Sequence, residues 1–229
     1  MSQGVSLRIA WDVSIPSDDV FLPGEVKVPV GASGIVLFAH GSGSSRFSPR
    51  NQSVASSIRE AGIGTLLFDL LTEREEEEER LTRHLRFDID LLTARLVDAT
   101  LWVRSQPDIR GLRVGYFGSS TGAAAALVAA SELSDTIGAI VSRGGRPDLA
   151  GESLTRVKAP TLLIVGGADD VVIEVNREAL SLLNCVKKLS IVPGATHLFE
   201  EQGALESVAD LAARWFSEHL SAKRSAESA

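Results

Sequence analysis

The sequence predicts an α/β fold in which a doubly wound, mostly parallel sheet carries helices on both faces. Short runs rich in valine, isoleucine and leucine alternate with longer amphipathic segments, the pattern of successive βα units. Several of the apolar runs open directly into loops of glycine and other small residues. At 229 residues, of which 44% are hydrophobic, the chain can bury the core of one such domain. We therefore expect a single domain over residues 1–229, without internal repeats.

The first part of the chain predicts an antiparallel pair followed by the first parallel strands. Residues 5–13 and 20–28 alternate between apolar and polar positions, and the turn Pro16-Ser17-Asp18-Asp19 joins them. Three further elements follow: a buried strand over 35–38, a helix over 51–60 that ends at Gly62, and a strand over 64–68.

Residues 88–105 predict a long amphipathic helix, because Leu92, Leu96, Ala99 and Val103 recur at spacings of four and three residues. The remaining expected elements are strand 114–117 with an alanine-rich helix after it, strand 137–141, strand 161–165, helix 175–183, strand 189–192 and helix 204–219. The glutamate run within residues 73–80 is expected to be a solvated loop or helix start, with a flap over the site as the functional alternative. No segment is long enough for a large cap domain, and residues 221–229 are expected to fray.

A strand-to-helix turn around Ser120 carries the strongest functional signal. The strand 114–117 runs into Gly118-Ser-Ser120-Thr-Gly122, a G-x-S-x-G motif, and the alanine-rich helix begins directly after it. In such a nucleophile elbow the turn is so tight that side chains at the two glycine positions would collide. The serine hydroxyl then stands at the tip of the turn, at the positive end of the helix dipole. We expect Ser120 to be a nucleophile.

A serine nucleophile needs a base, and the base needs a carboxylate that orients it. In α/β-hydrolases these partners follow the serine in the order acid, then histidine. Strand 161–165 ends at Gly-Gly-Ala-Asp169, and strand 189–192 ends at Pro-Gly-Ala-Thr-His197. The sequence therefore predicts a triad of Ser120, His197 and Asp169.

Two other acids and one other histidine are alternatives. Asp170 is adjacent to Asp169, although the spacing from the glycine pair favours Asp169. Asp148 follows strand 137–141, where some α/β-hydrolases carry the acid, but a structural turn fits its proline neighbour better. His40 is interpreted as a support for its loop through hydrogen bonds, because His197 already fills the role of base.

The loop after the strand 35–38 predicts an oxyanion hole. His40-Gly41 opens a series of small residues, which let backbone N–H groups approach a developing oxyanion closely. The expected donors are the N–H groups of Thr121, directly after the nucleophile, and of Ser42. Gly41 and Ser119 are expected to line the substrate site beside them.

Three segments give these motifs a family resemblance. HGSGSSR at residues 40–46, SPRN at 48–51 and RGGRPDL at 143–149 resemble a bacterial subgroup of the dienelactone hydrolase-like α/β-hydrolases. The similarity runs over residues 35–220 and implies an α/β-hydrolase fold; some members of the subgroup are fused to a phosphoribosyltransferase domain. Dienelactone hydrolases proper use cysteine at the elbow, whereas this chain has Ser120. The resemblance thus implies a serine hydrolase of unspecified substrate. Together with the triad, it leads us to expect a hydrolase that acts on small esters, lactones or related acyl compounds.

Arg143 and Arg146 flank two glycines immediately after strand 137–141. This edge of a parallel sheet is where α/β folds bind ligands, and a guanidinium can hold a carboxylate or phosphate of a substrate. Arg143 is the better candidate because it follows the strand directly. The structural alternative is that both arginines pair with nearby acids such as Asp148 or Glu152.

The bulk properties restrict the other classes of function. A formal net charge of −7 argues against a nucleic-acid-binding surface. Residues 1–14 lack a secretory signal pattern, and no apolar run approaches the roughly 20 residues that span a bilayer, so a cytoplasmic protein without membrane contact is expected. The single cysteine, Cys185, cannot form an internal disulfide, and no phosphate-binding loop of the Walker type is present.

The expected reaction needs a small-molecule acyl substrate and no metal or organic cofactor. Two other functions are compatible with the same triad. A sensor with this fold could bind a ligand with little turnover, and an acyltransferase or perhydrolase would use a different acceptor. The sequence leaves monomer and dimer equally open.

Overall fold

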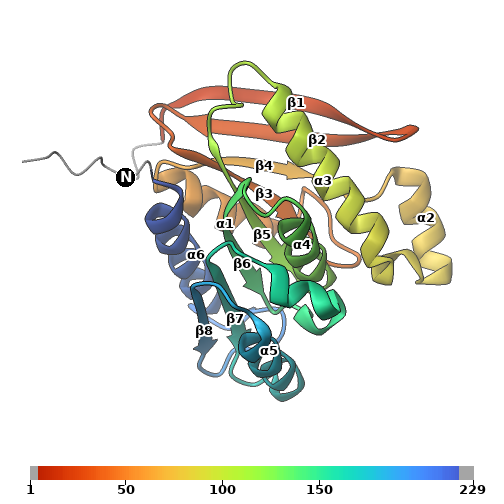
Figure 1. The fold of residues 1–229 in the computed structure, drawn as a ribbon, viewed down its shortest axis with the longest axis vertical. Helices are drawn as coiled ribbons and strands as arrows, with labels where there is room; N and C mark the ends of the chain where they lie inside the picture. Colours follow the sequence, from red (N-terminus) through yellow and green to blue (C-terminus); the bar gives the residue numbers. More distant parts are fainter. Residues whose placement is uncertain (1–4, 222–229) are drawn as a thin grey trace, which may run out of the picture.

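One eight-stranded sheet runs through the computed structural model, which describes residues 5–221 (Figure 1). Its strands lie in the order β1-β2-β4-β3-β5-β6-β7-β8. Their bounds are Leu7–Ser17, Val20–Pro29, Gly34–Ala39, Gly64–Phe68, Arg113–Ser119, Ile137–Arg143, Thr161–Gly166 and Lys187–Val192 for β1 to β8. β2 pairs antiparallel with β1 and β4, and every neighbouring pair from β4 to β8 is parallel. The mostly parallel sheet predicted from the sequence is confirmed.

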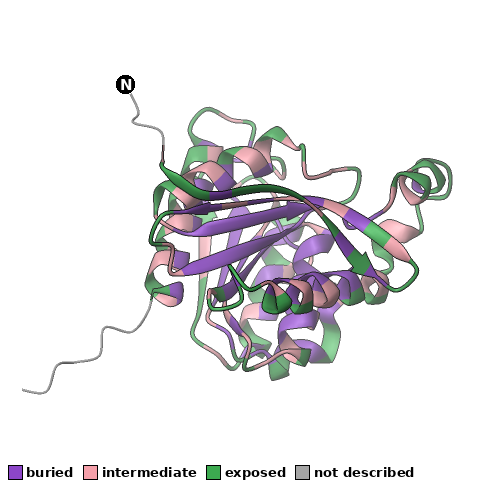
Figure 2. Ribbon diagram, turned by 90° about the horizontal axis from the view of Figure 1, so that it is seen from above, coloured by how far each residue is buried: buried purple, intermediate pink, exposed green. Residues whose placement is uncertain are grey.

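Helices cover both faces of this sheet, as expected for a doubly wound fold. Their bounds are α1 Pro49–Glu60, α2 Glu73–Thr82, α3 Ile89–Ser105, α4 Thr121–Glu132, α5 Asp170–Leu182 and α6 Ala204–Leu220, with 3₁₀ turns η1 Leu85–Phe87 and η2 Pro147–Arg156. α1 and α6 enclose a core that contains Phe38 and Phe117, whereas α3 and α4 enclose the core around Tyr116. Figure 2 shows the central strands as a buried layer between these helices. The expected frayed tail, residues 221–229, lies outside the described residues except for Ser221.

The N-terminal hairpin is longer than the sequence predicted. β1 continues through Pro16 and Ser17, and only Asp18 and Asp19 form the turn. Pro16 pairs in register with Phe21. A proline is tolerated here because β1 is the edge strand, where a missing N–H interrupts no second ladder.

Two helices begin earlier than expected. α1 starts at Pro49 rather than at residue 51, because proline suits the first helical position and the Ser48 side chain accepts a hydrogen bond from the Asn51 N–H. α5 starts at Asp170 rather than at residue 175, directly after Asp169. Both starts bring a helix N-terminus to the carboxyl edge of the sheet, where the site residues lie.

The glutamate run is a helix, α2, and not a loop. Its start is a capping box: the Thr72 side chain accepts from the Glu75 N–H, and the Glu75 carboxylate accepts from the Thr72 N–H. The acidic first turn also complements the positive end of the helix dipole. These local interactions stabilise a helix that has no apolar stripe.

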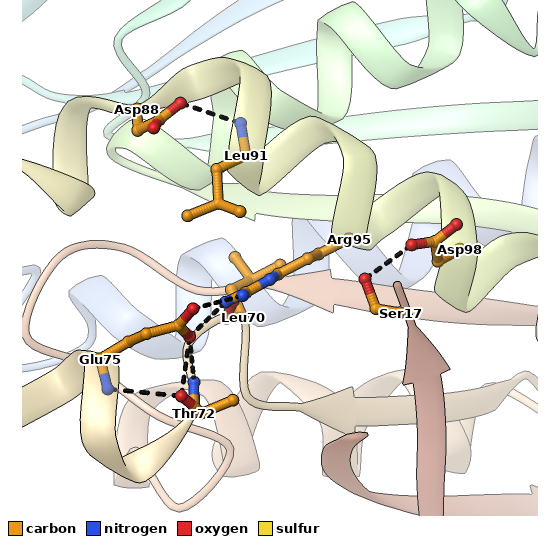
Figure 3. Close-up of polar contacts among 8 residues, drawn as sticks. All are labelled: Ser17, Leu70, Thr72, Glu75, Asp88, Leu91, Arg95 and Asp98. Atoms are coloured by element: carbon orange, nitrogen blue, oxygen red, sulfur yellow. Dashed lines mark hydrogen bonds and ion pairs between the residues drawn. The ribbon is translucent and has the colours of Figure 1, made fainter. Parts of the chain in front are cut away.

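Ion pairs fix α2 to its neighbours. Both terminal nitrogens of Arg95 on α3 lie 2.6 Å from the Glu75 carboxylate, and Arg95 also donates to the Leu70 carbonyl oxygen (Figure 3). At its other end, the buried Glu79 pairs with Arg86 in η1. Between β4 and α3 the chain adds only α2 and η1, so no large cap domain covers the described sheet edge.

Candidate active site

The turn around Ser120 has the geometry expected of a nucleophile elbow. Ser120 lies between β5 and α4 with φ 51° and ψ −122°, a conformation that costs a non-glycine residue about 1–3 kcal/mol. A Cβ atom on Gly118 would overlap the backbone of α4, and one on Gly122 would overlap the Ala39 carbonyl oxygen. The Ser120 hydroxyl forms no capping hydrogen bond with the helix that it precedes. It therefore projects from the elbow as a free group.

His197 and Asp169 are in direct contact. His197 lies on the loop between β8 and α6, and its Nδ1 is 2.7 Å from Oδ2 of Asp169, which follows β7. The carboxylate side chain is 17% exposed and the imidazole 41% exposed, so the acid is shielded while the ring reaches the open edge. A hydrogen bond from Nδ1 holds the proton on that nitrogen and leaves Nε2 as the acceptor, the tautomer that a general base requires.

Strand β6 connects the elbow with the histidine loop. The Ser120 N–H donates to the Arg143 carbonyl oxygen at 3.3 Å, and the next residue, Gly144, packs against the imidazole. A Cβ atom at Gly144 would lie 3.5 Å from the Cε1 atom of His197. Among residues 5–221 no direct hydrogen bond joins the Ser120 hydroxyl to His197 Nε2. Such bonds are often long in unliganded enzymes and shorten when substrate binds.

The other two acids lie elsewhere. Asp170 is exposed in the first turn of α5. Asp148 forms a two-pronged ion pair with Arg146, with Nε 2.9 Å and Nη2 2.6 Å from its carboxylate oxygens. Only Asp169 of the three contacts His197.

The loop after β3, residues 40–46, lies against the elbow; we call it the oxyanion loop because the sequence predicts an oxyanion donor in it. A Cβ atom on Gly41 would lie 3.0 Å from the Ser120 Cβ, a tight contact that glycine avoids. The next residue, Ser42, has its hydroxyl 3.2 Å from the Thr121 hydroxyl. Thr121 is the first residue of α4, so its N–H has no acceptor within the helix. The two N–H groups expected to hold an oxyanion thus belong to residues in contact beside Ser120.

His40 has both ring nitrogens engaged with backbone. Nδ1 lies 3.0 Å from the Gly41 carbonyl oxygen, and Nε2 accepts from the Leu70 N–H at 3.0 Å. Burial lowers the pKa of this imidazole against the opposing effects of the Gly41 hydrogen bond and the Asp69 charge, which keeps the ring neutral. His40 therefore braces the oxyanion loop against the segment after β4, as the sequence predicted.

A model of the dienelactone hydrolase family matches residues 22–226. The chain belongs to the dienelactone hydrolase family. A dienelactone hydrolase from Anabaena variabilis is 58% identical, with a TM-score of 0.90 over 92% of this chain and 98% of that one. The protein Est1E from Butyrivibrio proteoclasticus is only 15% identical, but its TM-score of 0.77 over 91% of this chain and 98% of that one shows the same fold.

Two proteins from strains of Mycobacterium tuberculosis are 56% identical over 209 residues and carry a provisional phosphoribosyl transferase name. The match covers 91% of this chain and 46% of theirs. The chain thus spans just under half the length of these curated relatives.

A cavity of about 600 Å³ lies between the loop after β3 and α2. One wall is the loop after β3, including Ser42, Phe47 and Arg50, and the other is the charged face of α2 with Glu76 and Arg80. A smaller hollow lined by Ser42, Thr121 and Glu76 continues it toward the expected oxyanion donors.

Arg143 and Ser119 lie beside the elbow as paired neighbours of β6 and β5. The Ser119 hydroxyl is buried and has no hydrogen-bond partner, and the same holds for Nε and Nη1 of Arg143. Burial, and secondarily the positive charge of Arg50, lower the pKa of Arg143 to about 10. The alternative that both arginines pair with nearby acids therefore holds for Arg146, which pairs with Asp148. It does not hold for Arg143.

Sequence reasoning offered a place for the glutamate run over the site only as an alternative, and it did not identify Arg50 as a residue that lines the cavity. The Thr72-x-x-Glu75 pattern is a capping-box signature and could have revealed the helix start. Arg50 sits in a segment already singled out for its family resemblance, but only the fold brings it near Arg143. Among residues 5–221, no group of His, Cys, Asp or Glu side chains could hold a metal ion, and no helix could cross a membrane.

Proposed function

We propose that this protein is a serine hydrolase that cleaves small esters, lactones or related acyl compounds through an acyl-enzyme intermediate. The proposal depends on the strained elbow at Ser120 and on the contact between His197 and Asp169. This contact holds the proton on Nδ1 of His197 and leaves Nε2 free to act as the base. Residues 1–229 are proposed to form one catalytic domain. The phosphoribosyl transferase name belongs to proteins about twice as long and assigns no activity to the shared part.

In the proposed reaction Ser120 attacks the acyl carbonyl carbon while His197 Nε2 takes the hydroxyl proton. Asp169 stabilises the imidazolium that forms, and the N–H groups of Thr121 and Ser42 stabilise the tetrahedral oxyanion. When the intermediate collapses, His197 returns the proton to the leaving alkoxide. Water then attacks the acyl-enzyme with the same base, which releases the acid and restores the Ser120 hydroxyl.

Labelling by a fluorophosphonate probe tests this proposal. The wild-type protein should be labelled and should show a burst of nitrophenol with an activated ester. Ser120→Ala should abolish labelling and lower the esterase rate by several orders of magnitude, on the order of 10⁴-fold or more, because the nucleophile is lost. Ser119→Ala, which alters the adjacent elbow serine, should still be labelled. A wild-type protein that binds esters without any burst would instead be a sensor.

A further inference from the structure

One loop holds both backbone groups of Ser120. This is the turn at the end of β6, residues 143–146, which we call the 143–146 loop. The Ser120 N–H donates to the Arg143 carbonyl oxygen at 3.3 Å, and the Ser120 carbonyl oxygen accepts from the Arg146 N–H at 3.1 Å. Ser120 has φ 51°, a conformation that a non-glycine residue keeps only where its surroundings hold it. The 143–146 loop supplies two of the contacts that do so.

The same loop contacts the proposed base. The Gly144 N–H donates to the Ile164 carbonyl oxygen of β7 at 2.8 Å. A Cβ atom on Gly144 would lie 3.3 Å from the His197 carbonyl oxygen and 3.5 Å from the Nδ1 and Cε1 atoms of its ring. The 143–146 loop thus touches both Ser120 and His197, so a shift of the loop would alter their relative position.

A fully buried asparagine on α5 binds the middle of this loop. Asn176 is 0% exposed, and its amide nitrogen donates to the Gly145 carbonyl oxygen at 3.0 Å and to the Val172 carbonyl oxygen at 2.8 Å. The bond to Val172 lies within α5, whereas the bond to Gly145 joins α5 to the loop. A Cβ atom on Gly145 would overlap the Ser142 hydroxyl and lie 2.7 Å from the Ala123 Cβ. The loop is therefore packed against α4 and bonded to α5.

Asn176 stands where an apolar residue would be the ordinary choice. Its buried neighbours on α5, which are Val172, Ile173 and Ala179, are all apolar. Asparagine is a poorer helix former than alanine, and burying an amide costs free energy unless the amide is hydrogen-bonded. The Oδ1 atom of Asn176 has no partner among residues 5–221, so only its N–H groups offset that cost. The bond to Gly145 is the one interaction among these that reaches outside the helix.

The helix that carries Asn176 also follows the proposed acid. α5 begins at Asp170, directly after Asp169, and the Ile173 N–H donates to the Asp169 carbonyl oxygen at 2.9 Å. Asp169 in turn contacts Nδ1 of His197. Asn176 therefore connects the helix that holds the acid with the loop that holds the nucleophile.

We propose that Asn176 is a positioning residue of the triad, which acts through Gly145 and the 143–146 loop on Ser120 and His197. The inference rests on the proposed hydrolase function and adds a side chain outside the triad that sets its geometry. Reacting groups must be held to within about 0.5 Å, and a misplacement of about 1 Å can cost on the order of 100-fold in rate. Loss of the Gly145 bond leaves every catalytic side chain present but removes the connection that aligns them.

Asn176→Leu tests the proposal because it removes both amide N–H groups at similar side-chain size. With 4-nitrophenyl butyrate, kcat should fall roughly 10- to 100-fold while KM changes by less than about two-fold, because acylation and deacylation depend on the same alignment. Fluorophosphonate labelling should slow by a similar factor. Ala179→Gly is the matched control: it weakens α5 at a buried position without removing the Gly145 bond, so it should lower the Tm and leave kcat unchanged. Asn176→Ala repeats the test should Asn176→Leu fail to fold.

Amide hydrogen exchange separates this proposal from the proposed hydrolysis. In Asn176→Leu the N–H groups of Ser120, Gly144 and Arg146 should exchange faster than in wild type, because the loop opens more often; Ala179→Gly should leave them unchanged. Faster exchange in a protein whose wild type is never labelled would overturn the hydrolase proposal alone. Faster exchange with an unchanged kcat would make Asn176 a purely structural residue and overturn the positioning role. Labelling and exchange that match Ala179→Gly would also overturn it and leave the hydrolase proposal intact.

Discussion

The Glu75–Arg95 pair gives a quantitative prediction about the α2 wall of the cavity. Glu75 accepts hydrogen bonds from both terminal nitrogens of Arg95 and from the N–H and hydroxyl of Thr72, at 2.6–2.9 Å (Figure 3). Glu75→Gln removes the negative charge but keeps the size of the side chain. Arg95, whose side chain is 5% exposed, would then lack its counter-ion.

The contacts of Glu75 give the expected loss of unfolding free energy. Burial acts to raise the pKa of Glu75, but hydrogen bonds from Arg95 and Thr72 outweigh it and lower the pKa from 4.5 to about 2. At about 1.36 kcal/mol per pH unit this corresponds to an upper limit of roughly 3 kcal/mol. The Glu75 side chain is 24% exposed, so solvent screening should reduce the contribution to about 1–2 kcal/mol. Leaving Arg95 unpaired adds to this, and we expect Glu75→Gln to lower the free energy of unfolding by about 2–3 kcal/mol at pH 7.

The sign of the pH dependence follows from the lowered pKa. The carboxylate contributes its stability fully above pH 4.5, its ordinary pKa, and loses it as the pH falls toward 2. Urea unfolding at pH 7 and pH 3 measures the difference in unfolding free energy between wild type and Glu75→Gln. Glu77→Gln, at an exposed position on the same helix, is the control. The deficit of Glu75→Gln should shrink at pH 3, because the unfolded carboxyl is protonated there and folding must ionise it, which removes a large part of the stability that the wild-type pair contributes at pH 7. A deficit at pH 7 no larger than that of Glu77→Gln would refute the reasoning.

Two further predictions concern the proposed catalytic machinery. Asp169→Asn should lower kcat for an activated ester on the order of 10⁴-fold by favouring the wrong imidazole tautomer, whereas Asp170→Asn should lower it far less; a reversal of the two would reassign the acid. Gly122→Ala places a methyl group against the Ala39 and His40 carbonyl oxygens and should destabilise by about 1–3 kcal/mol with loss of fluorophosphonate labelling. Gly111→Ala, at a site with open space, should change neither the Tm nor the labelling, and labelled Gly122→Ala of normal Tm would contradict the steric argument.

Much of the fold was predictable because its strands are buried on both faces. Every residue of β3, β4 and β7 is buried, so these strands read as continuous apolar runs bounded by glycine or a loop. The helix α3 was equally clear, because its buried apolar residues recur at helical spacing. The glutamate run was left open between a loop and a helix start, because α2 depends on a capping box and on ion pairs to distant arginines rather than on apolar periodicity. The start of α5 was placed five residues too late, because it overlaps the loop that carries Asp169.

The candidate site was also predictable in part. The elbow, the acid and the histidine each follow a strand, so their shared edge could be inferred from the order of the elements. The different pairing of Arg143 and Arg146 could not be inferred from the sequence. Arg143 and Arg146 are three residues apart in one glycine-rich turn, yet only Arg146 finds Asp148, because pairing depends on where the fold directs each side chain.

Arg143 forms no ion pair within residues 5–221, although several other arginines do. Acidic residues outnumber basic ones by 30 to 23, so carboxylates are in ample supply. Four other arginines each hold a carboxylate partner: Arg46 with Asp69, Arg86 with Glu79, Arg95 with Glu75 and Arg146 with Asp148. A fold that satisfies these four would gain from satisfying Arg143 too, since a single nearby carboxylate would remove the cost of its burial.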